Sequence, residues 1–150
     1  MSAPPPAPDG LQRFLEAQAA TFDAALAELR AGAKRSHWMW FVFPQLAGLG
    51  HSDLARHYAL RDLAEARAYL AHPVLGARLA DAMHAVLAHD GRTALDLLGA
   101  PDDLKLHSCA SLFALVSPPG SVFHQVLARF FDGAVDEATL RLLGFGALDP

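Results

Sequence analysis

The spacing of apolar residues constrains this chain more than any other feature of its sequence. Between residues 11 and 31 the apolar side chains recur every three or four positions, at Leu11, Phe14, Leu15, Phe22, Leu26 and Leu29. This period matches the turn of an α-helix and places the side chains on one face. Gln18 interrupts that face, and Gly32 is a residue suited to ending a helix. The spacing therefore predicts an amphipathic helix that ends at Gly32.

Capping and breaking residues divide the rest of the chain into further helices. Residue types that cap helix N-termini precede apolar-periodic stretches at Ser52, Asp62, Ser121 and Asp136. The run Ser-Pro-Pro-Gly at 117–120 must end a helix that opens at Pro101. We predict an all-α fold of about seven or eight helices, in one compact domain over residues 11–144. Residues 1–10 are expected to form a disordered Pro-rich tail, and residues 145–150 a C-terminal tail.

An aromatic segment, KRSHWMWFVFPQLAGLG at 34–50, contains both tryptophans of the chain. Its apolar part, WMWFVF, alternates enough to suggest a strand, but a single strand without a partner would leave buried backbone groups unpaired. We therefore interpret 37–42 as a short buried helix at the centre of the fold. It should end before Pro44, because the residue preceding a proline disfavours the α region.

Composition excludes several classes of function. The formal charge is −4, and no cluster of Lys and Arg is larger than the Lys34–Arg35 pair, which argues against a nucleic-acid partner. The longest fully apolar run, Trp38 to Phe43, is too short for a membrane span, so no membrane partner is expected. With one cysteine and no features of a secretory signal, the expected location is cytoplasmic.

The flanks of the aromatic segment carry the first candidate ligand-binding residues. Trp38 and Trp40 combine large apolar faces with polar tips, a common lining of small-molecule sites, and His37 and Gln45 add polar groups at either end. Lys34 and Arg35 would attract an anion. The alternative is that the tryptophans simply fill the core. Histidine is the residue type best suited to proton transfer near neutral pH, which makes His37 the one candidate for that role, although a hydrogen-bonded core histidine is the alternative.

Three residues elsewhere complete the candidate set. Only two of the 12 cations are lysines, Lys34 and Lys105. One interpretation is that each retained lysine marks a need for a compact ammonium group, and the alternative is chance survival on a solvated face. Ser108 follows Lys105 on the same predicted helix. Gln18, within an apolar face, must find hydrogen-bond partners, in the core or in a cavity. No histidine spacing or cysteine pair suggests a metal, and no cofactor is expected.

Four segments of the chain resemble the bacterial and fungal family known as domain of unknown function 1810. The most specific is K-R-S-H-W-M-W-F-x-F-P-Q, and the resemblance runs from about Leu11 to Leu143. In the helix of Lys105 this chain departs from the expected L-K-x-R-S-S-x-T-L-F, so no cationic site beyond Lys105 is implied. The resemblance implies an all-helical fold without an established activity. Some members are labelled calpastatin, but such inhibitors resemble disordered repeats, and this chain shows no repeat.

Two functional hypotheses follow. The first is a site for an anionic, planar, nucleotide-like small molecule, with enzymatic activity left open. Its ligand-binding residues would be Gln18, Lys34, Arg35, His37, Trp38, Trp40, Gln45, Lys105 and Ser108. The second is a non-catalytic adaptor for a protein partner, with the aromatic segment as core. The first requires polar groups that are far apart in sequence to converge, whereas the second requires an exposed apolar patch. The oligomeric state stays open.

Overall fold

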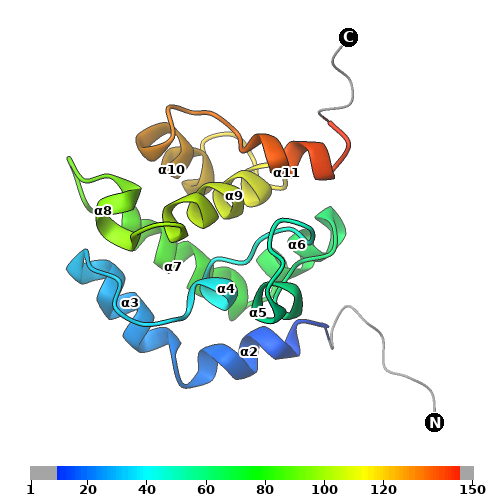
Figure 1. The fold of residues 1–150 in the computed structure, drawn as a ribbon, viewed down its shortest axis with the longest axis horizontal. Coiled ribbons are helices and arrows are strands. Elements are labelled where there is room, and N and C mark those ends of the chain that lie inside the picture. The colour runs from blue at the N-terminus through cyan, green and yellow to red at the C-terminus, as the bar shows by residue number, and fades with distance from the viewer. Residues whose placement is uncertain (1–9, 146–150) are drawn as a thin grey trace.

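The computed structural model describes residues 10–145, which form an all-α fold (Figure 1). Ten helices and no strand are present among these residues, against the seven or eight helices expected. They are α2 (Gln12–Ala19), α3 (Phe22–Ala31), α4 (Met39–Val42), α5 (Asp53–His57), α6 (Leu63–Ala71), α7 (Leu75–Leu87), α8 (Ala94–Leu98), α9 (Asp102–Ala114), α10 (Val122–Phe130) and α11 (Glu137–Leu142). Residues 1–9 and 146–150 of the two expected tails lie outside the described residues. None of the described helices is long and apolar enough to cross a membrane.

The predicted helix over residues 11–31 is two helices, and this break accounts for part of the higher count. α2 ends at Ala19 and α3 begins at Phe22, with Ala20 and Thr21 between them. The two halves pack against different neighbours, α2 against α4 and α3 against α7. The end of α3 is as predicted, because Gly32 adopts the left-handed conformation, with φ of 75°.

The four predicted N-caps are confirmed. The side chains of Ser52, Asp62, Ser121 and Asp136 each accept a hydrogen bond from a backbone amide in the first turn of the following helix. Each side chain satisfies one of the amide groups that a helix N-terminus leaves without a partner. The helix after Ser52 is shorter than predicted, ending at His57 rather than Leu60.

The aromatic segment forms a short buried helix, as predicted. α4 spans Met39–Val42, with Trp38 at its N-terminal boundary, and Phe43 ends it immediately before Pro44. The side chains of Trp38, Met39 and Phe43 are inaccessible to solvent, whereas Trp40 is partly exposed. The residues of α9 from Ser108 to Ala114 are all buried, and this helix contacts α6, α8, α10 and α11.

The loop between α4 and α6 begins and ends at a pair of backbone hydrogen bonds that join residues 45–47 to Leu60. The Leu60 amide donates to the Gln45 carbonyl oxygen at 2.9 Å, and the Ala47 amide donates to the Leu60 carbonyl oxygen at 2.7 Å. These bonds form an isolated parallel bridge between Leu46 and Leu60. The loop between them carries α5, which buries none of its residues. The bridge therefore holds residues 45–47 beside Leu60, where the loop begins and ends.

Candidate functional site

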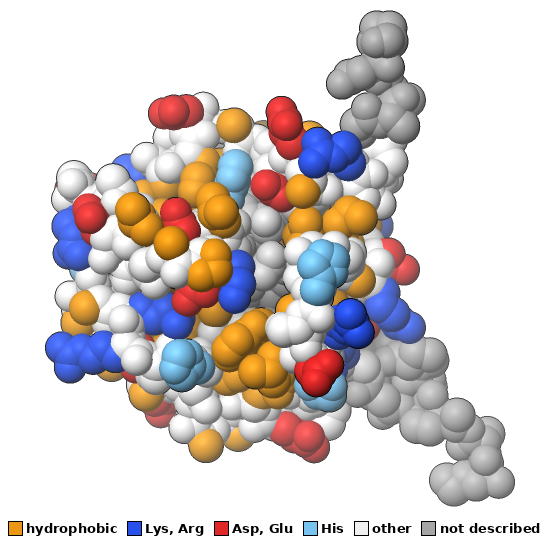
Figure 2. Space-filling model, viewed as in Figure 1, with side chains coloured by type: hydrophobic (Ala, Val, Ile, Leu, Met, Phe, Trp, Pro, Cys, Tyr) orange, Lys and Arg blue, Asp and Glu red, His pale blue; other side chains and the backbone are white. Residues whose placement is uncertain are grey.

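A cleft of about 440 Å³ lies where four segments meet: α4, residues 45–52, the beginning of α9 and the beginning of α11. Figure 2 shows the hollow near the middle of the visible face, with basic and histidine side chains near its edges. Of the nine predicted ligand-binding residues, four line the cleft: Trp40, Gln45, Lys105 and Ser108. The fold thus brings Trp40 and Gln45 together with two residues that lie 60 or more positions further along the sequence. This convergence is the property that the small-molecule hypothesis requires.

The two tryptophans occupy different environments although they are two residues apart. Successive helical residues are rotated by about 100°, so Trp38 and Trp40 point to nearly opposite sides of the chain. Trp38 is fully buried, and its indole N–H donates to Oε1 of Glu28 at 2.9 Å. Trp40 presents part of its indole to the cleft. Of the two, Trp40 is the available stacking surface, and Trp38 belongs to the core.

One carboxylate holds both lysines. Asp102 Oδ2 lies 2.8 Å from Nζ of Lys34, and its Oδ1 lies 3.3 Å from Nζ of Lys105. Each ammonium group also lies over an indole ring, Lys34 at 5.1 Å from the centroid of Trp38 and Lys105 at 5.2 Å from that of Trp40. Lys34 further donates to the Ser36 carbonyl oxygen at 2.7 Å. The ammonium of Lys34 is therefore committed to internal contacts, whereas that of Lys105 lies at the cleft.

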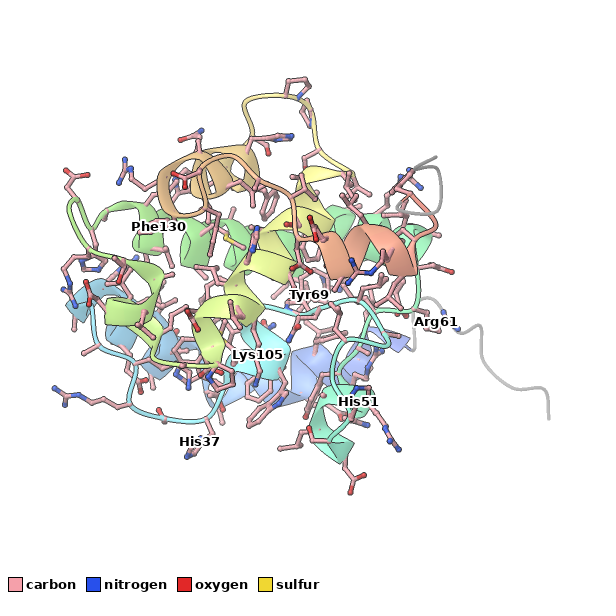
Figure 3. All side chains as sticks on the ribbon, turned by 45° about the horizontal axis from the view of Figure 1, so that its top comes forward. His37, His51, Arg61, Tyr69, Lys105 and Phe130 are labelled. Carbon is pink, nitrogen blue, oxygen red and sulfur yellow. The ribbon has the colours of Figure 1, made fainter. Side chains whose placement is uncertain are left out.

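Two residues that the sequence did not single out as ligand-binding, His51 and Asp136, also line the cleft. Figure 3 shows Lys105 on α9 and His51 on the loop before α5, two separate segments that border the cleft. His51 follows Gln45 and two glycines in the loop, and this proximity was the only available signal. Asp136 was recognised solely as a helix cap. Its place beside Ser108, with Ser108 Oγ 3.2 Å from Asp136 Oδ2, arises from tertiary packing.

Other predicted site residues lie elsewhere. His37 and Arg35 are exposed on the segment before α4 and do not line the cleft, and Figure 3 shows His37 at the outer edge of the molecule. The chain around them is held by Glu28, which accepts hydrogen bonds from the amides of Arg35 at 2.7 Å and Ser36 at 3.1 Å and from the Ser36 hydroxyl. Partial burial of Glu28 raises the pKa of its carboxyl group, but these hydrogen bonds and that of Trp38 outweigh the effect and lower the pKa to about 2.

Gln18 is buried at the junction of α2, α4 and α6. Its amide nitrogen donates to the Phe41 carbonyl oxygen at 2.6 Å and to the Tyr69 hydroxyl at 3.0 Å, and its Oε1 accepts from Nη1 of Arg78 at 3.3 Å. Both Gln18 and Tyr69 are almost inaccessible, and burial raises the pKa of Tyr69 well above its ordinary value. The predicted requirement for partners is met by protein groups.

Neither a reactive cysteine nor a metal cluster adds to the cleft among the described residues. Cys109 is fully buried in α9, where burial raises the pKa of its thiol. Between residues 10 and 145, no three His, Cys, Asp or Glu side chains gather closely enough to hold a metal ion.

Comparison with known proteins places the chain in a family. The family described as "Protein of unknown function (DUF1810)" matches residues 8–143. The chain belongs to this family. It is also similar to the conserved hypothetical protein Rv1873 from Mycobacterium tuberculosis, whose crystal structure was determined at 1.38 Å. The two are 47% identical, with a TM-score of 0.88, over 91% of this chain and 97% of that one. No protein of curated function matches the chain.

Proposed function

We propose that the cleft between α4, residues 45–52, α9 and α11 binds a small anionic molecule with a planar part. The observation that carries this proposal is the position of the Lys105 ammonium over the partly exposed ring of Trp40, inside a cleft of about 440 Å³. An indole face and a compact cation at one place suit a planar group joined to an anionic one. The volume falls within the roughly 300–1,000 Å³ of small-molecule sites.

Lys105 is free to exchange its present contacts for those of a ligand. Its only ion pair among the described residues is with Asp102, at 3.3 Å, and its side chain is a quarter exposed to solvent. An ion pair of this kind contributes only about 0–1 kcal/mol, so a ligand anion can replace Asp102 at small cost. Because Lys34 keeps its shorter contact with the same carboxylate, Asp102 would not be left without a partner.

Some of the remaining predicted residues would contact the ligand directly, and the others would act indirectly. Gln45 and Ser108, with His51, would form hydrogen bonds to the ligand from the cleft wall. Lys34 would act through Asp102, and Gln18 and Trp38 would support the wall of α4 from behind. Arg35, exposed on the segment before α4, would add positive potential near the protein surface, and His37 on the same segment would offer a hydrogen-bonding group. The proposal concerns binding in the cytoplasm, and no catalytic step is assigned to His37.

The test is a thermal-shift screen with nucleoside monophosphates and diphosphates, ADP-ribose, sugar phosphates and aromatic carboxylates, followed by calorimetric titration of each compound that raises the melting temperature. Lys105→Met removes the cleft cation. Arg67→Met, on an exposed part of α6 away from the cleft, removes one positive charge as well and is the matched control.

Binding by the wild type and Arg67→Met, with at least tenfold weaker binding by Lys105→Met and Trp40→Ala, is the expected result. Should no compound bind, or should Lys105→Met bind as well as the control, the cleft is not an anion site. The alternative, a non-catalytic adaptor for a protein partner, would then be the better hypothesis.

A further inference from the structure

A carboxylate lies in the cleft that we propose for an anion, and this determines what else the ligand must carry. Asp136 Oδ2 accepts hydrogen bonds from the Thr139 amide at 3.0 Å, the Thr139 hydroxyl at 2.6 Å and the Ser108 hydroxyl at 3.2 Å. The Asp136 amide donates to Ser111 Oγ at 2.8 Å, so the backbone is fixed as well. The second oxygen, Oδ1, forms no hydrogen bond with any of residues 10–145, and the residue lines the cleft.

We infer that Oδ1 of Asp136 accepts hydrogen bonds from hydroxyl groups of the ligand, and that the ligand is a ribonucleotide. This inference rests on the proposed anion site at Lys105. The base would lie on Trp40, the phosphate would bind Lys105, and the vicinal hydroxyls of the ribose would donate to Asp136. A carboxylate that accepts from ribose hydroxyls is a recurrent arrangement in nucleotide sites.

The spacing along α9 supports this division of the cleft. Lys105 and Ser108 are three residues apart, so they lie on one face of the helix with about 4.5 Å of axial rise between them. The Ser108 hydroxyl contacts Asp136, which places the carboxylate about one turn along α9 from the lysine. A ligand whose anionic group and hydrogen-bond donor are a few ångströms apart could bind the Lys105 ammonium and the Asp136 carboxylate at the same time.

The surroundings of Asp136 favour hydroxyl groups over a cationic amine as its ligand. Three donors on Oδ2 already stabilise the negative charge of the carboxylate, so Asp136 does not require a cationic partner. The other polar side chains of the cleft include three neutral ones, Gln45, Ser52 and Ser108. Neutral donors and acceptors of this kind suit the hydroxyls of a ribose and the edge of a base.

The test compares adenosine 5′-monophosphate with its 2′,3′-dideoxy analogue, which keeps the base and the phosphate but lacks both hydroxyls. Calorimetric titration of the wild type should show the ribonucleotide binding at least about tenfold more tightly, as expected for hydrogen bonds to a charged acceptor. Asp136→Asn should bring the two affinities within about threefold of each other by weakening only the ribonucleotide. Asparagine caps helices as well as aspartate does, so α11 should remain folded.

Glu137→Gln removes an exposed carboxylate from the next position and should leave both affinities unchanged. If the wild type binds both nucleotides equally and Lys105→Met binds neither, the inference about Asp136 is overturned while the anion site stands. The inference is also overturned if other anions bind through Lys105 but adenosine and guanosine monophosphates do not. Failure of every anion to bind overturns both proposals.

Discussion

Glu28 offers a quantitative test of how the aromatic segment is held in place. Its carboxylate accepts four hydrogen bonds from residues 35–38, one of them from the buried indole of Trp38. The fall in pKa from 4.5 to about 2 would correspond to at most about 3.4 kcal/mol of stabilisation, at 1.36 kcal/mol per unit of pKa. Because Glu28 is only partly buried, solvent screening reduces this value, and we expect Glu28→Gln to cost about 1.5–2 kcal/mol at pH 7.

The pH dependence distinguishes the charge of Glu28 from simple packing. A carboxyl group whose pKa is lowered by folding stabilises the protein fully above its unfolded pKa of 4.5, and this stabilisation is lost as the pH falls through about 2. The unfolding free energies of the wild type and of Glu28→Gln, from urea titrations, should therefore converge between about pH 5 and pH 2. Glu16→Gln, at an exposed position of α2, is the control. A difference that stays constant down to pH 2 would refute the assignment to the ionised carboxylate.

Four further substitutions test the packing. Trp38→Ala should lower the unfolding free energy by about 3–5 kcal/mol and Trp40→Ala by about 1–2 kcal/mol, because only the indole of Trp38 is fully buried. Chemical denaturation of both variants should show this order, and equal losses of unfolding free energy would contradict it. Gln18→Leu should cost about 1–3 kcal/mol, since it leaves two buried groups without their hydrogen-bond partner, and a neutral effect in the same assay would refute that role. Gly76→Ala should lower the melting temperature markedly, because its Cβ would lie 2.1 Å from the carbonyl oxygen of Leu70. A protein with the unchanged melting temperature would show that α6 and α7 separate at little cost.

Local signals in the sequence were sufficient for most helix boundaries. A cap such as Ser52 or Asp136 acts on amides two or three residues away, so its effect is contained in the sequence around it. The break between α2 and α3 was not predicted, because the apolar period continues across Ala20 and Thr21 and neither glycine nor proline marks the bend. The break depends on which helices the two halves pack against, and that information is tertiary.

The site was predictable only in part for the same reason. Trp40, Gln45 and Lys105 were recognisable by residue type, but periodicity gives the angle between Trp38 and Trp40 without showing which of them faces the core. The contribution of Asp136 depends on the packing of α11 against α9, about 30 positions away in sequence from Lys105. The indole and the ammonium group of the proposed site could therefore be predicted from the sequence, whereas the carboxylate could not.

The bridge that closes the loop at Gln45 and Leu60 has a consequence for how this family can vary. Since α5 buries none of its residues, local unfolding of α5 exposes little apolar surface and should occur far more readily than global unfolding. Amide hydrogen exchange should be fast within α5, while the amides of Ala47 and Leu60 remain protected. The length and composition of the loop can thus change without disturbing the core. Because His51 and Ser52 lie on it, a change of this loop alone would alter the lining of the proposed cleft.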